Sequence, residues 1–145
     1  MAQQSLPTED KEAPQGELTT RTMAMPKDTN AAGDIFGGWV VSQMDIAGGI
    51  CASQCALGRV VTVAIDSMTF IRPVKVGDVM CVYTDVQRIG KSSMKIAIEA
   101  WALRNRTGLR EKVTEAIFTF VSVTDEGVPM AISEERHAAY PNATR

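Results

Sequence analysis

A single carboxylate, Asp45, interrupts a long uncharged stretch of the chain. Between Ile35 and Gly58 every other side chain is neutral, and most of them are apolar or glycine. Placed on a helix, this stretch is apolar on almost every side, which is typical of an element covered by other structure. An ionised carboxylate there is costly unless it is paired, hydrogen-bonded or placed in a polar cleft. The position indicates a functional aspartate; the alternative is a buried Asp satisfied by backbone groups or an arginine.

The helix that would carry Asp45 opens with two glycines, Gly37 and Gly38. Glycines let a ligand approach the backbone closely, and the N–H groups of a first helical turn have no partners inside the helix. Together with the helix dipole they form a place for a carbonyl oxygen that gains negative charge. The alternative is that the two glycines only permit the turn from loop to helix.

Asn30 precedes this helix, in a segment rich in turn-forming residues at 26–34. Its side-chain amide can donate a hydrogen bond to a substrate carbonyl or hold a water molecule. A turn or a cap is the commoner role of a loop asparagine, and both roles remain open from the residues alone. We predict that Asp34 is the N-cap of the helix or a residue near the cap.

The spacing of these groups predicts a site shared by two chains. Asp45 follows Gly37 by eight residues, which is about 12 Å along a helix axis. Groups that act on one carbonyl must sit about 3 Å from it, so one carbonyl cannot touch both groups of the same helix. If both take part, each helix gives its N-terminus to one site and its aspartate to another, at a dimer interface.

A second cluster of polar groups lies in a predicted hairpin at residues 88–93, with the sequence RIGKSS. Its cations, hydroxyls and turn amides could hold a phosphate or a pyrophosphate. The surrounding pattern is strand–turn–strand rather than strand–loop–helix, so the segment is not a P-loop. Solvated hairpin charge is the alternative, and the sequence leaves both open.

Several other kinds of chemistry are disfavoured. The lone histidine, His137, sits in the C-terminal segment, so neither a Ser-His-Asp triad nor a Cys-His pair is readily formed. A dehydratase built on such a helix would usually use an active-site histidine, and the helix region contains none. Three cysteines in apolar surroundings are expected to be reduced core residues rather than metal ligands: Cys51, Cys55 and Cys81.

Composition describes one ordinary globular domain. The chain has 145 residues, of which 22% are charged, and its formal net charge of −2 gives no sign of the basic stripe of a nucleic-acid-binding protein. The uncharged stretch is long enough for a bilayer, but its polar residues and glycines make it a poor membrane helix. No secretory signal is expected at the N-terminus, and the reduced thiols predict a cytoplasmic location.

The pattern of the chain predicts an α+β fold with one long helix and an antiparallel sheet. We expect a flexible N-terminal tail at 1–16, a central domain at 17–132 and a C-terminal helical tail at 133–145. The expected elements are a strand at 18–25, a helix at 36–57, strands at 59–72, 79–89, 92–104 and 112–124, and a helix at 133–140. Short connections imply antiparallel pairing, and a sheet of this size can curl around one helix.

Four segments carry a resemblance to a known family: DTNAAGDIFGGWVVSQMDIAG, RVVTVAIDSMTFIRPVKVGDVMCVY, GKSSMKIAIEAW and VTEAIFTFVSV. In this order, over about residues 20–130, they resemble the hotdog-fold acyl-CoA thioesterases. The type they resemble is that of the bacterial YciA-like acyl-CoA hydrolases, which are related to the animal brain acyl-CoA hydrolases. The resemblance implies a hotdog fold, in which a long central helix is wrapped by a curved antiparallel sheet.

The resemblance also implies roles for individual residues. The family's catalytic acid falls on Asp45, the loop amide on Asn30 of the opposite chain, and the amide at the helix start on Gly37. The family's CoA-contacting segment falls on Gly90, Lys91, Ser92 and Ser93. Lys91 stands where an arginine is more common, which keeps the charge but loses bidentate geometry.

We therefore expect an enzyme that hydrolyses acyl-CoA to a fatty acid and free CoA without a metal or redox cofactor. Asp45 would act as a general base on water or attack the carbonyl itself. Family members form homodimers and often hexamers, as trimers of dimers. The alternatives are a non-catalytic acyl-CoA-binding protein of the same fold and a structural interaction protein. The acyl tunnel would depend on packing around Met44, Gly48, Ala52 and the facing strands, which the sequence does not place. Val41, Gly48, Gly49 and Ala52 share the helix face of Asp45. Three of these four are very small, which suits a cleft and tight helix packing equally.

Overall fold

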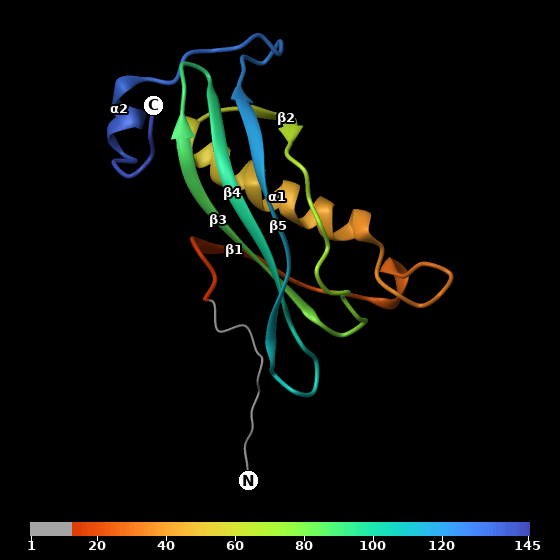
Figure 1. The fold of residues 1–145 in the computed structure, drawn as a ribbon. Helices are drawn as coiled ribbons and strands as arrows, with labels where there is room; N and C mark the ends of the chain where they lie inside the picture. The colour runs from red at the N-terminus through yellow and green to blue at the C-terminus, as the bar shows by residue number, and fades with distance from the viewer. Residues whose placement is uncertain (1–12) are drawn as a thin grey trace.

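The computed structural model describes residues 13–145 and shows a sheet with one long helix along a face (Figure 1). The five strands lie in the order β1-β3-β4-β5-β2, and every neighbouring pair is antiparallel. The strands are β1 (Glu17–Met23), β2 (Val60–Ile65), β3 (Val79–Ile89), β4 (Ser93–Leu103) and β5 (Arg110–Ser122). The helices are η1 (Pro26–Asp28), α1 (Gly37–Ala56) and α2 (Glu134–Ala138). The predicted α+β hotdog architecture is confirmed.

The strand predicted over residues 59–72 is the one element whose extent differs clearly. The paired strand β2 ends at Ile65, after a bulge between Thr62 and Ala64. Beyond it no paired strand follows before β3, and the chain keeps only scattered backbone bonds to β5, such as Ile71 N to Val113 O at 2.8 Å. A bulge twists a strand away from its partner, so the β-branched pattern continues past the point where pairing stops.

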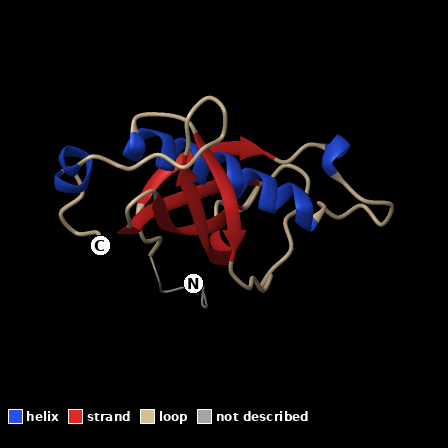
Figure 2. Cartoon of the chain, turned by 90° about the horizontal axis from the view of Figure 1, so that it is seen from above, coloured by secondary structure: helices blue, strands red, loops and turns tan. Residues whose placement is uncertain are grey.

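One face of α1 packs on the sheet and forms the core (Figure 2). Met44, Ala47 and Ala52 are fully buried against side chains of β4 and β5. A Cβ placed on Gly48 would lie 2.6 Å from Ile98 Cδ1 and 2.8 Å from the Phe120 ring. The packing around Met44, Gly48 and Ala52, which the sequence did not place, is thus close within this chain.

The opposite face of α1 is bare within one chain. Ile46 and Ile50 keep 52% and 40% of their surface exposed, although the sequence pattern predicts cover on almost every side. The neighbouring edge strand β2 pairs with β5 alone and also exposes the apolar side chains of Val63 and Ile65. An apolar helix face beside an open sheet edge is the form of surface that a second copy of a chain covers.

The two ends of the chain pack differently. Most of the predicted tail at 1–16 lies outside the described residues, and of its described part Gln15 donates its N–H to Glu99 Oε1 at 3.2 Å. The C-terminal segment at 133–145 is helical only over α2, and Arg136 donates to the last carbonyls of α1, including Cys55 O at 3.0 Å. No helix within residues 13–145 is long and apolar enough to cross a membrane.

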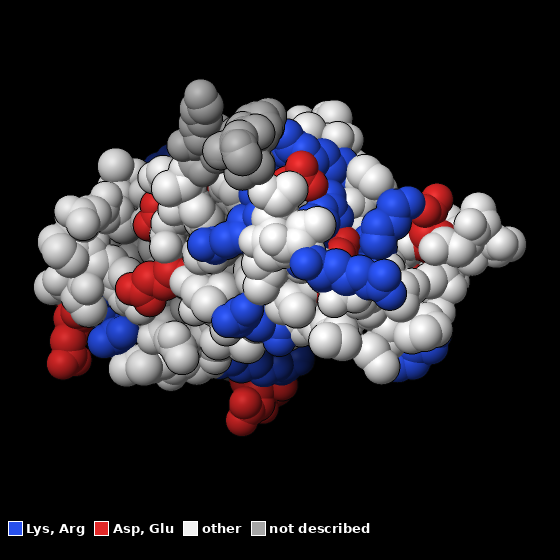
Figure 3. All heavy atoms as spheres, turned by 90° about the horizontal axis from the view of Figure 1, so that it is seen from below, with Lys and Arg blue, Asp and Glu red and all other residues white. Residues whose placement is uncertain are grey.

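Lysine and arginine side chains gather on the face seen from below, where the β4–β5 loop lies (Figure 3). Much of this charge is engaged inside the protein. Arg104 forms ion pairs with Asp78 at 2.6 Å and Glu111 at 2.8 Å, and Arg110 donates to the hydroxyl of Tyr83. The basic surface is thus in good part a set of contacts that fix the loop and the sheet.

Candidate active site

Asp45 lies at the margin between the bare face of α1 and the edge strand β2. Its side chain is partly exposed within one chain, on the side of α1 that this chain does not cover. Thr62 of β2 donates its hydroxyl to Asp45 Oδ1 at 2.6 Å. Among the described residues Oδ2 has no hydrogen-bond partner. One oxygen is thus held by the protein, and the other is available to a water molecule.

Thr62 is a site residue that the sequence did not reveal. It lies 17 residues beyond Asp45, on a different element, and only the fold brings the two together. A threonine in a β-branched strand is an ordinary sheet residue. Its alternation with apolar neighbours gives no sign of the contact, so no local signal would have found it.

The loop before α1 fixes the side chain of Asn30. Asn30 Oδ1 accepts from the backbone N–H of Ala32 at 2.9 Å and of Asp34 at 3.1 Å, which closes the loop in the manner of an Asx turn. The side-chain oxygen must face these two donors, so the orientation of the amide is determined. Its NH₂ group has no partner in the described part of the chain. The turn role and the donor role, which the sequence left as alternatives, are compatible in one side chain.

The start of α1 lies beside this loop. A bridge between Thr29 and Ile35 closes the loop, and Phe36 donates its N–H to Asp28 O at 3.1 Å. Gly37 is the first helical residue, and no acceptor for its N–H is found within residues 13–145. The Asn30 amide and the Gly37 N–H therefore stand as two unused donors on neighbouring segments.

Asp34 lies two residues before the N-cap of α1 and is not the N-cap itself. The N-cap residue is Phe36, whose side chain makes no capping bond. Asp34 instead pairs with Lys75 at 2.8 Å and so ties the loop to the connection between β2 and β3. No side chain caps α1, so the N–H of Gly37 remains available to an external acceptor, whereas that of Trp39 donates to Phe36 O at 3.1 Å.

Asp45 and the two donors cannot serve one carbonyl within a single chain. Gly37 and Asp45 lie on the same continuous helix, and about 12 Å of helix rise separates them. The bare face of α1 and the open edge of β2 lie next to Asp45. The geometry supports the sequence-based argument that one site needs Asp45 from one chain and Asn30 and Gly37 from another.

The β3–β4 turn contains the predicted CoA-contacting residues Gly90, Lys91, Ser92 and Ser93. Gly90 donates its N–H to Ser93 O at 2.8 Å, which closes the turn, and Lys91 is exposed. Phe120 of β5 pairs with Met94 on one side and with Thr62 on the other. Two strand spacings, about 10 Å, therefore separate the beginning of β4 from β2, whose Thr62 donates a hydrogen bond to Asp45. The CoA role of the turn stays a prediction.

The cysteines and the histidine take no part in this cluster. Cys55 and Cys81 are buried and Cys51 packs against the core. Burial raises the pKa of the Cys55 thiol to about 11, with the nearby Cys51 adding to the effect, so the thiol stays protonated near neutral pH. His137 lies on α2, away from Asp45. Within the described residues no three His, Cys, Asp or Glu side chains are grouped to hold a metal ion.

The arrangement suits attack of water on a polarised carbonyl. A carboxylate with one free oxygen can accept a proton from water. Two N–H donors, one from a side-chain amide and one from a helix start, can stabilise an oxygen that becomes negative. These are the parts of a hydrolase for an activated acyl group.

Comparisons with known proteins agree with this chemistry. The model of the thioesterase superfamily matches residues 32–109 of the chain. The acyl-CoA thioester hydrolase YciA of Escherichia coli (strain K12) is 54% identical over 125 residues, which cover 84% of this chain and 95% of the relative.

Two solved structures show the same fold at substantial identity. A hexameric broad-specificity acyl-coenzyme A thioesterase has a TM-score of 0.86 and 46% identity, over 92% of this chain and 95% of that one. The hexameric thioesterase of Yersinia pestis has a TM-score of 0.81 and 53% identity, over 84% of this chain and all of that one.

Proposed function

Since this chain belongs to the thioesterase superfamily, among the acyl-CoA thioester hydrolases, we infer that it cleaves acyl-CoA to free CoA and a carboxylic acid. The observation that carries the inference is the hydrogen bond from Thr62 to Asp45 Oδ1, which holds a carboxylate with a free oxygen beside an open interface. The site itself, with its residue roles, is part of the proposal.

Asp45 acts as the general base. Its Oδ2 takes a proton from water while the water oxygen attacks the thioester carbon, which gives a tetrahedral intermediate. When the intermediate collapses, the carbon–sulfur bond breaks and the proton held by Asp45 passes to the departing CoA sulfur. The products are a carboxylic acid and CoA thiol, and Asp45 returns to its carboxylate form. No metal or redox cofactor has a step in this scheme.

The opposite chain supplies the donors. The Asn30 amide and the Gly37 N–H, both without other partners among the described residues, would bind the thioester oxygen and stabilise it as it gains charge. Asn30 is held by its oxygen, so its NH₂ group is already oriented before substrate binds. Preorganised donors of this kind need no rearrangement during the reaction.

Assembly follows from the same geometry. A site divided between chains requires at least a homodimer, and the bare face of α1 with the open edge of β2 is the surface we assign to it. The solved relatives are hexamers, so we propose a homohexamer built as a trimer of dimers. We place the enzyme in the cytoplasm, which the reduced thiols support.

The test is release of free thiol from a panel of acyl-CoAs by the wild-type chain and by Asp45→Ala. Loss of a general base lowers the rate by about 10²–10⁴-fold, and we expect this loss with the oligomer mass unchanged. Asp125→Ala, in the turn after β5, is the control and should keep wild-type turnover. Near-wild-type turnover by Asp45→Ala would contradict the general-base role of Asp45. If the wild type bound acyl-CoA without turnover, the chain would be a non-catalytic acyl-CoA-binding protein.

A further inference from the structure

A cavity of about 290 Å³ opens beside the first turn of α1. Gly37 forms part of its wall, so the cavity begins where the proposed donors would hold the thioester oxygen. The apolar side chains that line it come from the loop before α1, from α1 itself, from the β2–β3 connection and from β5: Ile35, Val40, Phe70, Ile71, Val74 and Val113.

Phe70 lies beside the helix start and lines the cavity together with Gly37. A Cβ placed on Gly37 would lie 3.5 Å from two carbons of the Phe70 ring, so the ring rests on the first turn of α1. Phe70 is nevertheless 44% exposed within the chain. A chain attached to a carbonyl at Gly37 would have to pass along this ring to enter the cavity.

The charged side chain that lines the cavity, Arg72, interacts with other residues of the protein. Arg72 lies on the wall, but its guanidinium donates to Lys112 O at 2.7 Å and faces Glu111 at 3.7 Å. The deeper side chains, such as Val40 and Val113, are almost completely buried and carry no polar group. The interior of the cavity therefore matches a hydrocarbon rather than a charged or hydrogen-bonding ligand.

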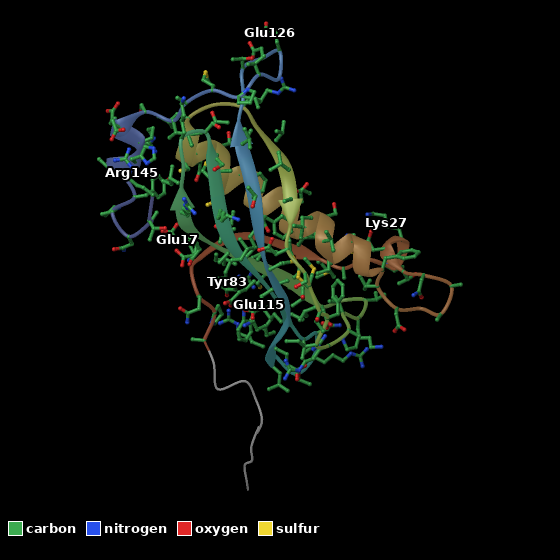
Figure 4. All side chains as sticks on the ribbon, turned by 45° about the horizontal axis from the view of Figure 1, so that its top comes forward. Glu17, Lys27, Tyr83, Glu115, Glu126 and Arg145 are labelled. Carbon is green, nitrogen blue, oxygen red and sulfur yellow. The ribbon has the colours of Figure 1, made fainter. Side chains whose placement is uncertain are left out.

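A larger cavity of about 360 Å³ is a poorer match. It lies between Cys51, β3 and the C-terminal segment, and polar groups such as Thr84, Gln54 and Asn142 line it. Cys51 follows Gly37 by about 21 Å of helix rise. Figure 4 shows the two regions at opposite ends of α1, marked by Lys27 on η1 and by Arg145 near α2.

We propose that the cavity beside Gly37 binds the acyl chain of the substrate, and that Phe70 and Ile71 set the length of chain accepted. The proposal rests on the thioesterase function inferred above. The cavity lies at the start of α1, away from the closely packed position of Gly48. Its volume is at the lower end of small-molecule sites, which predicts a limit on chain length.

The experiment measures kcat/KM for acetyl-, butyryl-, hexanoyl- and decanoyl-CoA with the full-length assembled enzyme. Burial of one methylene corresponds to about a fourfold gain, so the wild-type ratio of hexanoyl-CoA to acetyl-CoA should be on the order of 10². Ile71→Trp narrows the mouth and should reduce this ratio at least tenfold. Val128→Trp is the matched control, because Ile71 and Val128 are both 57% exposed, and it should retain the wild-type ratio.

Phe70→Ala provides a second, opposite change. Removal of the ring lengthens the space, so the ratio of decanoyl-CoA to hexanoyl-CoA should rise about fourfold or more. Melting temperature and oligomer mass establish that each variant is folded, and Phe70→Ala decides the matter if Ile71→Trp does not fold. If the kcat/KM ratios of the folded variants stayed within twofold of wild type, the proposal would be overturned; this would happen, for example, if a partner chain filled the cavity. Failure of the thioesterase function would give a different result, because the wild type would then release no thiol from any of the four acyl-CoAs.

Discussion

Thr62 Oγ1 lies 2.6 Å from Asp45 Oδ1 and joins the middle of α1 to the edge strand β2. The bond does two things at once. It orients the carboxylate toward the open interface, and it leaves the second oxygen for a water molecule. Thr62 is therefore a positioning residue that acts through Asp45, and its hydroxyl, rather than its shape, carries the effect.

Replacement of Thr62 by valine tests this relationship, because valine keeps the branched shape and the strand propensity but removes the donor. A hydrogen bond to a charged group contributes about 1.5–3 kcal/mol, so kcat should fall roughly tenfold or more while KM stays close to wild type. Thr62→Ser restores the hydroxyl and should recover most of the activity. Equal losses in Thr62→Val and Thr62→Ser would show that packing, not the hydrogen bond, matters at this position.

Substitutions at Asn30 can separate the role of its side-chain oxygen in the loop from the proposed role of its NH₂ group in catalysis. Asn30→Asp keeps the oxygen that accepts from Ala32 and Asp34 but removes the NH₂ donor. We expect this variant to fold like wild type and to lose about 10²–10³-fold in kcat, the usual effect of one oxyanion donor. Asn30→Ala should lose activity similarly but also melt at a lower temperature, since it opens the loop. Full activity in Asn30→Asp, measured as thiol release, would contradict the donor role.

Adjacent glycines of α1 predict opposite changes in stability. A Cβ at Gly48 would overlap Ile98 and Phe120, whereas one at Gly49 meets nothing within 4 Å. Overpacking costs about 1–3 kcal/mol, while Gly to Ala in a helix gains up to about 1 kcal/mol. Gly48→Ala should therefore melt several degrees below Gly49→Ala, about 2–4 °C per kcal/mol for a chain near this size. Equal melting temperatures of Gly48→Ala and Gly49→Ala would show that the side chains around Gly48 move to accommodate a Cβ.

Helices and strands whose apolar residues recur at a regular spacing could be predicted from the sequence. The contacts between these elements could not. The long uncharged run gave α1 almost to the residue, and the alternating pattern gave β3 within its observed bounds. The end of β2 was missed because its β-branched residues continue past the bulge that ends pairing. Local periodicity reports which residues face a core, but it does not report where a strand leaves its neighbour.

The candidate site divides in the same way. The type and isolation of Asp45 pointed to chemistry, and helix rise alone separated it from Gly37. The apolar stretch did not reveal which chain covers each side of the helix, and Ile46 is 52% exposed within one chain. Thr62 and the cavity at Phe70 depend on residues far apart in sequence. They become visible only once the β2–β3 connection lies against the helix start.

A mixing experiment tests whether each site is divided between two chains. Asp45→Ala and Asn30→Asp each lack one half of the proposed machinery, and each should be inactive alone. In a mixed dimer one site combines both defects, while the other combines the intact Asp45 of one chain with the intact Asn30 of its partner. Random reassociation makes about half of the dimers mixed, with one good site in two, so about a quarter of wild-type thiol release should return.

The control for mixing uses Asp45→Ala chains reassociated with Asp45→Ala/Asn30→Asp chains, in which no combination restores a site. Subunit exchange is followed by mass, with one chain carrying a tag, so that failure to exchange is distinguished from failure to complement. Absence of recovery in chains shown to have exchanged would place Asp45 and Asn30 in the same chain's site. We expect recovery, because about 12 Å of helix rise separates Asp45 from Gly37, the donor that we group with Asn30.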